Sequence, residues 1–330
     1  MRYLITGGCG FIGRNLISRL KADPDNQIRV FDDLSVGSVD ALQTVMPVLR
    51  RGESEEPRFV EGAAELVIGN IRDLSAIRSV TAGAEIVVHL AANSGVALAV
   101  ADPEHDCGVN VLGTLNCLQA ARLHGVRRFV FASSGAPLGM CEPPLHEAMA
   151  PRPASPYGAS KLAGEAYCSA FFHCFGLETV VLRFANVYGP YSGHKTSVVA
   201  KLIREALRGE TWTLYGDGRQ TRDFIFIDDL CSAITKAALL PDVGGEIFQI
   251  ATNSETSVAE LADRLRIALR RHGVEAPPAA LGAIPQGDVR RNFSNIEKAA
   301  SHLGWRPHVD LDTGLALTLN WFLQQNAEPA

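Results

Sequence analysis

The sequence contains no long hydrophobic run. Nowhere in its 330 residues is there a stretch of the roughly 18–20 uncharged apolar residues that a membrane-spanning helix needs. The first strand-like run, Arg2–Thr6, leaves no room before it for a signal peptide. The seven cysteines include no CxxC pair and no ligand-like spacing to histidine, so neither a disulfide framework nor a metal site is expected. We therefore expect a cytoplasmic protein with reduced thiols, no bound metal and no membrane contact.

An excess of positive charge is also missing. Lys and Arg total 31 against 36 Asp and Glu, which gives a formal net charge of −5. Binding to nucleic acid depends on a basic surface that neutralises phosphates, so a nucleic-acid partner is not expected. An anionic ligand must instead be met by a local basic cluster. With 47% hydrophobic and 20% charged residues, the composition is that of an ordinary globular protein with a large core.

The first half of the chain alternates strand-like and helix-like segments, which is typical of a parallel sheet covered on both faces. The expected strands are Arg2–Thr6, Gln27–Phe31, Glu85–Leu90, Arg128–Ala132 and Thr179–Phe184. The expected helices are Ile12–Lys21, Asn110–His124 and Ser160–Phe175. The charge-rich segment Arg50–Pro57 is expected to be a solvated loop. This pattern predicts the α/β class, with a doubly wound Rossmann sheet.

Beyond Tyr188 the strict alternation weakens, and we expect a smaller substrate-binding lobe in the C-terminal third. Its expected elements are a helix at Ser197–Arg208, a strand at Trp212–Tyr215 and a helix at Val258–Arg271. Two further strands, Phe224–Ile227 and Glu246–Ile250, either return to the main sheet or build a small second one. The predicted division assigns 1–186 with 221–254 to the Rossmann domain. It assigns 187–220 with 255–330 to the lobe.

Three glycines, Gly7, Gly10 and Gly13, lie between the first expected strand and the first expected helix. In this context one glycine turns the chain, one lets the backbone approach a pyrophosphate, and one packs the helix on the strand. The helix N-terminus offers free N–H groups to the phosphates. Asp32 ends the next strand about 20 residues later, where a carboxylate binds the ribose hydroxyls and repels a 2′-phosphate. The sequence therefore predicts NAD rather than NADP as the cofactor.

Ser134, Tyr157 and Lys161 are the candidate catalytic residues. Ser134 follows an expected strand at the carboxyl edge of the sheet, where open α/β sheets bind ligands. Tyr157 and Lys161 are four residues apart, which places both on one face of a helix. The charge of Lys161, together with the positive nicotinamide ring nearby, is expected to lower the pKa of Tyr157. The phenolate then accepts a proton from a substrate hydroxyl while hydride leaves for NAD. Ser134 can share that hydrogen bond and orient the substrate.

Short motifs follow one another in a fixed order along nearly the whole chain. They are Gly7–Gly13, Asp32–Ser35, Gly69–Asp73, His89–Ala92, Asn110–Thr114, Tyr157 with Lys161, Arg183–Pro190, Gln220–Phe224 and Leu303–Trp305. In these motifs the chain resembles the extended short-chain dehydrogenases/reductases, and among them the NAD-dependent nucleotide-sugar epimerase/dehydratase family. The resemblance implies a nucleotide sugar as substrate and oxidation at its C4 as the first step.

The resemblance also implies further ligand contacts. The glycines of the loop, Asp32, Tyr157 and Lys161 are all expected to contact the cofactor. The further cofactor contacts that the resemblance implies are Phe11, Ile12, Asp33, Ser35, Gly37, Asn70, Ile71, Leu90, Ala91, Ala92 and Asn110. On the substrate side, Asn186 is expected at the sugar diphosphate, and Arg222 at the pyrophosphate through its guanidinium fork. Tyr215 and Asp288 complete the expected substrate contacts, Asp288 at the nucleoside ribose.

Three positions depart from the family pattern. Asn70 replaces the usual Asp, although its carbonyl can still accept a hydrogen bond from the adenine amino group. Pro137–Gly139 stands where Val-Tyr-Gly is common. Pro285 occupies a position where the family often has a phosphate-binding arginine, and Arg290 or Arg291 is the alternative for that role.

The type of reaction follows from what stands beside Ser134. In this family, dehydratases carry Asp-Glu directly after the Ser/Thr position and decarboxylases keep a Glu there, whereas this chain has Gly135 and Ala136. Epimerisation needs only the serine, the tyrosine and the lysine, so a UDP-sugar 4-epimerase with a transient 4-keto intermediate is favoured. A nucleotide-sugar 4,6-dehydratase or decarboxylase is the first alternative function, and a non-catalytic NAD-binding sensor is the second alternative.

The sugar is left open between a UDP-hexose, such as UDP-glucose/galactose, and a UDP-hexuronate. The insertion Tyr191–Ser197 brings His194 and Lys195 toward the substrate lobe, where Lys195 is a candidate contact for a C6 carboxylate. A solvated loop is at least as good an interpretation of this pair. Members of the family often dimerise through two helices, and Asn110–His124 with Ser160–Phe175 are expected to form such a homodimer interface.

Overall fold

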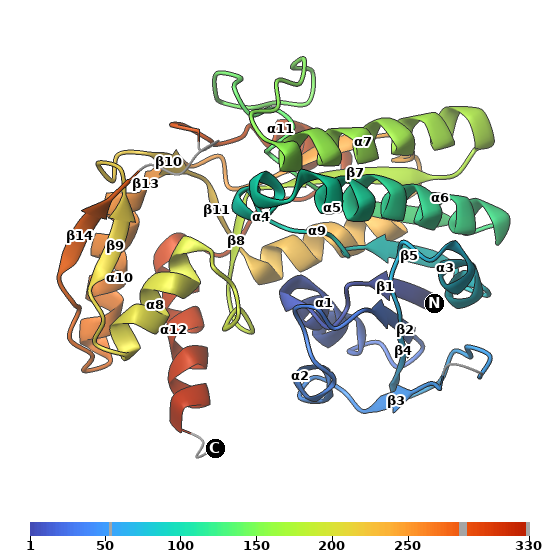
Figure 1. The fold of residues 1–330 in the computed structure, drawn as a ribbon, viewed down its shortest axis with the longest axis horizontal. Helices are drawn as coiled ribbons and strands as arrows, with labels where there is room; N and C mark the ends of the chain where they lie inside the picture. Colours follow the sequence, from blue (N-terminus) through green and yellow to red (C-terminus); the bar gives the residue numbers. More distant parts are fainter. Residues whose placement is uncertain (53–54, 284–288, 328–330) are drawn as a thin grey trace.

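The computed structural model describes residues 1–52, 55–283 and 289–327, and it shows one large sheet between two layers of helices (Figure 1). The sheet has eight strands in the order β12-β7-β6-β5-β1-β2-β4-β3, and every neighbouring pair is parallel. The strands are β1 (Arg2–Thr6), β2 (Gln27–Asp32), β3 (Val48–Arg50), β4 (Ala64–Ile68), β5 (Ile86–His89), β6 (Arg128–Ser134), β7 (Thr179–Phe184) and β12 (Ile247–Ile250). The fold is therefore α/β with a Rossmann-type sheet, as predicted.

Both faces of this sheet are buried because its strands carry apolar residues at consecutive positions. Leu4 packs with the helices α3 (Leu74–Thr81), α6 (Thr114–Leu123) and α7 (Pro156–Phe175). Ile5, the next residue, packs on the other face with α1 (Phe11–Leu20) and α9 (Ile227–Leu239). From β1 the chain winds to β2 on one side and to β5 on the other, so the strand order reverses between β1 and β5. Ligands of open α/β sheets bind at the carboxyl ends of the strands at such a point.

The strands expected from the sequence are confirmed, with β2 and β6 extending slightly further than expected. Both alternatives for the late strands occur: β12 joins the main sheet beside β7, whereas β11 (Phe224–Phe226) pairs with β8 (Asn186–Tyr188) in a separate sheet. The sequence analysis missed β3 and β4. In β4 the fully buried Glu65 interrupts the apolar pattern, and Arg29 neutralises it with an N–O distance of 2.7 Å.

Two helices differ from the expected bounds. The expected helix at 110–124 begins earlier, as a π-helical turn η1 (Gly108–Gly113), and continues as α6. The expected helix at 160–175 begins at Pro156, because the Ser155 side chain caps it by accepting from the Gly158 N–H. Proline at the first helical position reinforces this start. The remaining helices of this part are α2 (Val39–Gln43), α4 (Val96–Ala101) and α5 (Pro103–Cys107).

Apart from α9 and β12, most elements that follow β8 form a smaller lobe at the carboxyl edge of the sheet (Figure 1). It contains α8 (Val198–Leu207), β9 (Trp212–Tyr215), α10 (Val258–Arg271), β14 (Ala279–Gly282) and α12 (Leu311–Ala327), with β10 (Thr221–Arg222), β13 (Thr256–Ser257) and α11 (Glu297–His302) beside them. One core cluster continues from the sheet into this lobe, so the predicted domain boundaries stay a prediction. None of the described helices is long and apolar enough to cross a membrane.

Candidate active site

The glycine loop after β1 has the backbone geometry that its sequence requires. Gly7 has φ +71°, and a Cβ placed on it would lie 2.7 Å from the Ala91 backbone N. A Cβ on Gly13 would lie 2.5 Å from the Gly8 Cα, so α1 packs directly against the turn. Neither position has room for a side chain, because the opposing atoms belong to the backbone. The loop therefore brings the N-terminus of α1 to the ends of β1 and β5.

Asp32 is fixed in place by the backbone around it. Its carboxylate accepts hydrogen bonds from the backbone N–H groups of Cys9 and Leu34, both at 2.9 Å. Burial raises the pKa of Asp32, while these two hydrogen bonds act in the opposite direction. A carboxylate held at the end of β2 in this way can accept from ribose hydroxyls without reorienting.

The glycine loop and Asp32 line a cleft of about 340 Å³. Most of the cofactor contacts expected from the sequence lie along it: Gly7, Gly10, Phe11, Ile12, Gly13, Asp32, Asp33, Ser35, Gly37, Asn70, Ile71, Leu90, Ala91 and Ala92. Asn70 donates from its amide to Asp33 at 3.1 Å and accepts from the Arg72 N–H at 2.9 Å. Although Asn70 replaces the usual Asp, its hydrogen bonds still connect the Asp33 side chain to the backbone of Arg72 at this end of the cleft.

The cleft fits a dinucleotide. Gly10 is the N-cap of α1 and provides no capping side chain, so the first N–H groups of the helix are left for phosphate oxygens. A Cβ on Gly10 would meet only the Gly7 carbonyl oxygen, at 3.3 Å, and would otherwise occupy the space above the loop. Apolar side chains of Ile71 and Leu90 provide flat walls for a base. These residues would hold NAD, with its adenosine toward Asp32.

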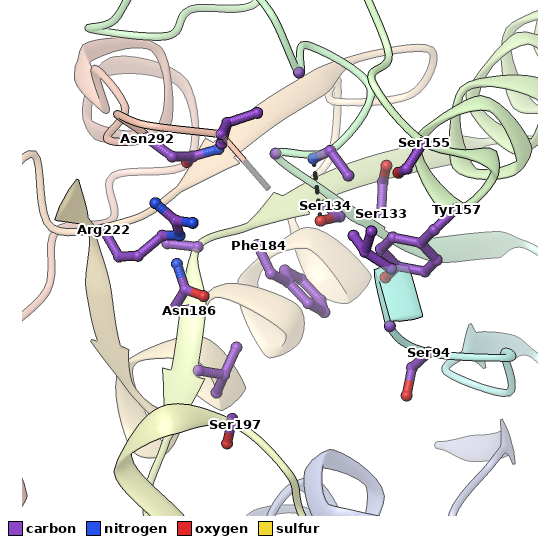
Figure 2. Close-up of a pocket in the computed structure, with 18 of the residues that line it drawn as sticks. Ser94, Ser133, Ser134, Ser155, Tyr157, Phe184, Asn186, Ser197, Arg222 and Asn292 are labelled. Carbon is purple, nitrogen blue, oxygen red and sulfur yellow. Dashed lines mark hydrogen bonds between the residues drawn. The ribbon is translucent and has the colours of Figure 1, made fainter. Parts of the chain in front are cut away.

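A second cavity of about 400 Å³ adjoins the cleft, and both are lined by Phe11, Ile12, Ser94 and Lys195. Figure 2 shows Ser134 and Tyr157 on one side of this cavity and Asn186 and Arg222 on the other. Ser134 stands at the end of β6, and its hydroxyl accepts from the Ala136 N–H at 3.2 Å. The cavity thus brings hydroxyl and phenol groups opposite an amide and a guanidinium.

Burial dominates the pKa of Tyr157. It raises this pKa to about 12, and a side-chain hydrogen bond with Ser134 opposes the rise only in part. Lys161 donates from Nζ to the Ala132 carbonyl at 2.8 Å, and its Nζ lies 6.0 Å from the centre of the Tyr157 ring. Burial also lowers the pKa of Lys161 to about 8. The side chains around Tyr157 do not by themselves lower its pKa, because loss of hydration at the phenol outweighs them. The expected contribution of the positive nicotinamide ring stays a prediction.

Several expected site residues lie elsewhere. Asn110 is buried and lines neither of these two cavities; its amide donates to Asp106 at 2.8 Å. Tyr215 is exposed on β9, with the Lys201 ammonium 4.5 Å from its ring centre, and lines neither cavity. Asp288 and Pro285 lie outside the described residues. Among the proposed substitutes for a phosphate-binding arginine, Arg291 pairs with Glu255 and Glu142, both at 2.7 Å.

The structure adds residues that the sequence analysis did not select. Ser94, Phe184, Thr196, Ser197 and Asn292 line the second cavity. Ser94 follows β5 at the edge where β1 and β6 also end, so its position relative to a strand end was the one available signal. Asn292 is far away in sequence and has no motif. Only the packing of the C-terminal segment brings it to the cavity.

Among the described lining residues of the second cavity there is no Asp or Glu, whereas Lys195 and Arg222 contribute positive charge. His89, at the end of β5, is not part of the site. It is buried between the hydroxyls of Thr6 and Thr114, at 2.7 and 3.0 Å, and burial lowers its pKa to about 3. A neutral, buried ring held between two hydroxyls makes His89 a structural histidine.

Comparison with known proteins gives consistent matches over the whole chain. The family model for the NAD dependent epimerase/dehydratase family matches residues 3–251. A UDP-glucose 4-epimerase of Mycolicibacterium smegmatis is 38% identical over 327 residues, which is 98% of each chain. A crystal structure of a UDP-glucose 4-epimerase of Thermotoga maritima with UDP-glucose superposes with a TM-score of 0.87 at 32% identity, covering 99% of this chain and 100% of that one.

A dehydratase is similar to the same degree. The dTDP-glucose 4,6-dehydratase of Streptomyces venezuelae, solved with NAD bound, superposes with a TM-score of 0.87 at 31% identity and covers 99% of this chain and 98% of that one. Overall similarity therefore does not separate the two reaction types. The cleft geometry, the family match and these relatives agree on the cofactor, and the chain belongs to the NAD-dependent epimerase/dehydratase family, with NAD as its cofactor.

Proposed function

We propose that this protein is a 4-epimerase of a UDP-sugar that acts through a transient 4-keto intermediate. The observation that carries the proposal is the set of groups around the second cavity: Ser134 and Tyr157 are present, and no described lining residue is a carboxylate. Removal of water across C5–C6 needs an acid and a base in addition to the tyrosine. Inversion at C4 needs only one group that takes a proton and gives it back.

Tyr157 is proposed to be that group. Its phenolate accepts the proton of the sugar 4-hydroxyl, and Ser134, already hydrogen-bonded to the phenol, orients the same hydroxyl. Bound NAD would supply the acceptor and then the donor of the hydride at C4, and its positive ring would favour the ionised form of Tyr157. Lys161 keeps its ammonium at the end of β6 through the Ala132 carbonyl and adds a second positive charge on the same side. After the 4-keto sugar has rotated in the site so that its other face meets the cofactor, Tyr157 returns the proton to the oxygen at C4.

The opposite side of the cavity is proposed to hold the diphosphate. Arg222 offers a guanidinium fork and Asn186 an amide at the place where Figure 2 shows them facing the cavity. Lys195 lies where the cavity meets the cofactor cleft, and no ion pair of Lys195 occurs in the described parts of the chain. A cation in this position suits either a phosphate or the C6 carboxylate of a hexuronate, so both sugar classes belong in the test.

The test is incubation of the NAD-loaded protein with UDP-glucose, UDP-glucuronate and dTDP-glucose, with products identified by NMR and mass spectrometry. We expect a 4-epimer of a UDP-sugar with unchanged mass. A product that has lost water or CO2 would replace the proposal by a dehydratase or decarboxylase. Binding of NAD and nucleotide sugars without turnover by any of them would replace it by a sensor.

A homodimer is proposed as the assembled form. Leu123 on α6 and Tyr167 and Phe175 on α7 are exposed on the outer face of the sheet's helical layer. We propose that a second copy of the chain packs against these exposed side chains, because α6 and α7 of two subunits can together form a four-helix bundle. Light scattering in solution should give twice the chain mass, and Leu123→Glu should shift it toward the monomer. A monomeric wild-type protein would refute this assembly.

A further inference from the structure

A buried carboxylate, Asp106, lies behind the catalytic residues and has no role in the mechanism above. It belongs to α5, a short helix at the carboxyl edge of the sheet, and it is 1% exposed. It lines neither of the two cavities and so does not reach the ligands directly. Burying a carboxylate is costly unless it is hydrogen-bonded or paired, so its surroundings need an explanation.

Asp106 is connected to Tyr157 by a chain of hydrogen bonds. Its Oδ1 accepts from the side-chain amides of Asn110 at 2.8 Å and Asn93 at 3.2 Å. The Asn110 amide is also 3.1 Å from the Ser160 hydroxyl, and Ser160 donates to the Tyr157 backbone carbonyl at 3.1 Å. Asn110 reaches these partners from the π-helical turn η1, a local irregularity that is frequent at functional sites. The chain ends on the first turn of α7, which holds the phenol.

The charges that face Lys161 come from several elements. Asp106 approaches from α5, Glu165, Cys168 and Tyr157 from α7 itself, and His89 from β5. Burial lowers the pKa of His89 to about 3 and raises the pKa of the Cys168 thiol, so both are neutral near pH 7.

The two carboxylates differ in what neutralises them. Glu165 forms a buried ion pair with Arg183, with donor–acceptor distances of 2.7 and 2.9 Å, and also accepts from the Ser133 hydroxyl at 2.5 Å. Asp106 forms no ion pair within the described residues, and its hydrogen-bond donors are the neutral amides of Asn93 and Asn110. Its negative charge therefore acts on the buried Lys161 and the partly buried Tyr157, and no guanidinium among the described residues pairs with it to cancel that charge.

We propose that Asp106 is a positioning residue for this reaction: through Asn110 and Ser160 it fixes the first turn of α7, and through its charge it sets the pH range in which Tyr157 and Lys161 work together. The inference rests on the proposed function in one respect, since it takes Tyr157 as the group that exchanges the proton. It adds a residue that the sugar and the cofactor do not touch.

The direction of the charge effect is the same for both partners. A nearby negative charge favours protonated Lys161 and disfavours ionised Tyr157, so Asp106 raises both pKa values. Removing the charge should therefore lower both. A reaction that needs ionised Tyr157 and protonated Lys161 has a bell-shaped pH profile, and the whole bell should move to lower pH.

The experiment compares Asp106→Asn with wild-type NAD-loaded enzyme. Asparagine keeps the size and the accepting oxygen but removes the charge, so we expect both apparent pKa values of kcat to fall by about one unit. Glu104→Gln is the matched control, because Glu104 is an exposed carboxylate on the same short helix, and its removal should leave the bell in place. Ser160→Ala breaks the chain without changing charge. We expect it to lower kcat by about 10- to 100-fold at unchanged bell position.

A readout that does not depend on turnover accompanies the kinetics. The ultraviolet phenolate titration of NAD-loaded enzyme, taken as the difference from Tyr157→Phe, should move to lower pH in Asp106→Asn. An Asp106→Asn enzyme with the wild-type bell and the wild-type titration would overturn the inference, and so would a loss of kcat with neither shifted. Failure of the proposed function looks different, because wild-type enzyme would then form no epimer while the phenolate titration of the variant still reports on Asp106.

Discussion

The cofactor cleft and the substrate cavity adjoin one another and are built in opposite ways. The cleft is shaped largely by backbone: Gly7 and Gly13 leave no room for a Cβ, and the Asp32 carboxylate is held by backbone N–H groups. The cavity is shaped by side chains that come from β6, α7, β8, β10 and segments near residues 195 and 292. A backbone site can be read from a local motif, whereas a side-chain site has to be assembled by the fold.

The largest effect on turnover should come from removing one atom of the substrate cavity, the phenol oxygen of Tyr157. Tyr157→Phe removes only the phenol oxygen, so turnover should fall by about 10²- to 10⁴-fold while NAD binding is kept. Turnover and NAD affinity, measured on the same preparation, separate the two regions. Tyr167→Phe, an exposed tyrosine on the same helix, is the control and should be unaffected. Near-wild-type activity of the Tyr157 variant would contradict the mechanism.

The next largest effect should come from the backbone of the cofactor cleft, and it should lower both stability and NAD binding. Gly7→Ala forces a side chain against the Ala91 backbone at positive φ, and we expect a loss of about 1–3 kcal/mol in the free energy of unfolding together with weaker NAD binding. Gly125→Ala is the matched control, since Gly125 has φ +62° but nothing within 4 Å of the added Cβ. Denaturant unfolding should show a smaller loss for this control. Equal losses would mean that the close approach is unimportant.

A smaller change should follow from the charge at the end of β2. Asp32→Asn keeps the size but removes the negative charge that repels a 2′-phosphate, so the preference for NAD over NADP should fall by about tenfold. The ratio of the two dissociation constants, from calorimetric titration, measures it. Asp40→Asn, at an exposed position on α2, should leave the ratio unchanged. An unchanged ratio in the Asp32 variant would show that the charge of Asp32 does not set the preference for NAD over NADP.

An effect of about the same size tests the place where the two regions meet, at Lys195. Lys195→Met should raise the KM of a UDP-hexuronate by about tenfold if the ammonium meets the C6 carboxylate, and that of a UDP-hexose by less. Burial lowers the pKa of Lys195, so the difference should shrink further as the pH rises and the ammonium loses its proton. Arg208→Gln, an exposed cation on the surface of the lobe, is the control. Equal increases for both sugars would place Lys195 at the phosphates instead.

The sequence was most informative where a residue's role depends on its near neighbours. The expected strand at 128–132, the glycine loop and the capped helix near Tyr157 follow from local pattern and were found within a few residues. The missed strand β4 shows the limit of such patterns. Its Glu65 is hydrophilic in sequence, and the core accepts it because Arg29 from a neighbouring strand and Arg51 both pair with its carboxylate.

The same contrast explains which site residues were placed correctly. The expected cofactor contacts along the glycine loop and the ends of β2 and β5 line the cleft, because each follows a strand that the pattern already located. Asn110 belongs to a motif, but it lies in the π-helical turn η1 and its amide donates inward to Asp106. Neither Asn292 nor Asp106 carries a local signal, and both were missed.

By itself the sequence determined the α/β class, the NAD loop and the identity of the chemical groups, because these depend on spacing along one stretch of chain. Tertiary structure decided which groups meet. It hydrogen-bonded Ser134 to Tyr157, placed Lys195 where two cavities meet, and removed enough water from the partly buried Tyr157 to raise its pKa to about 12. The reason is physical: hydration and charge at a buried group depend on everything packed around it, including segments more than a hundred residues away.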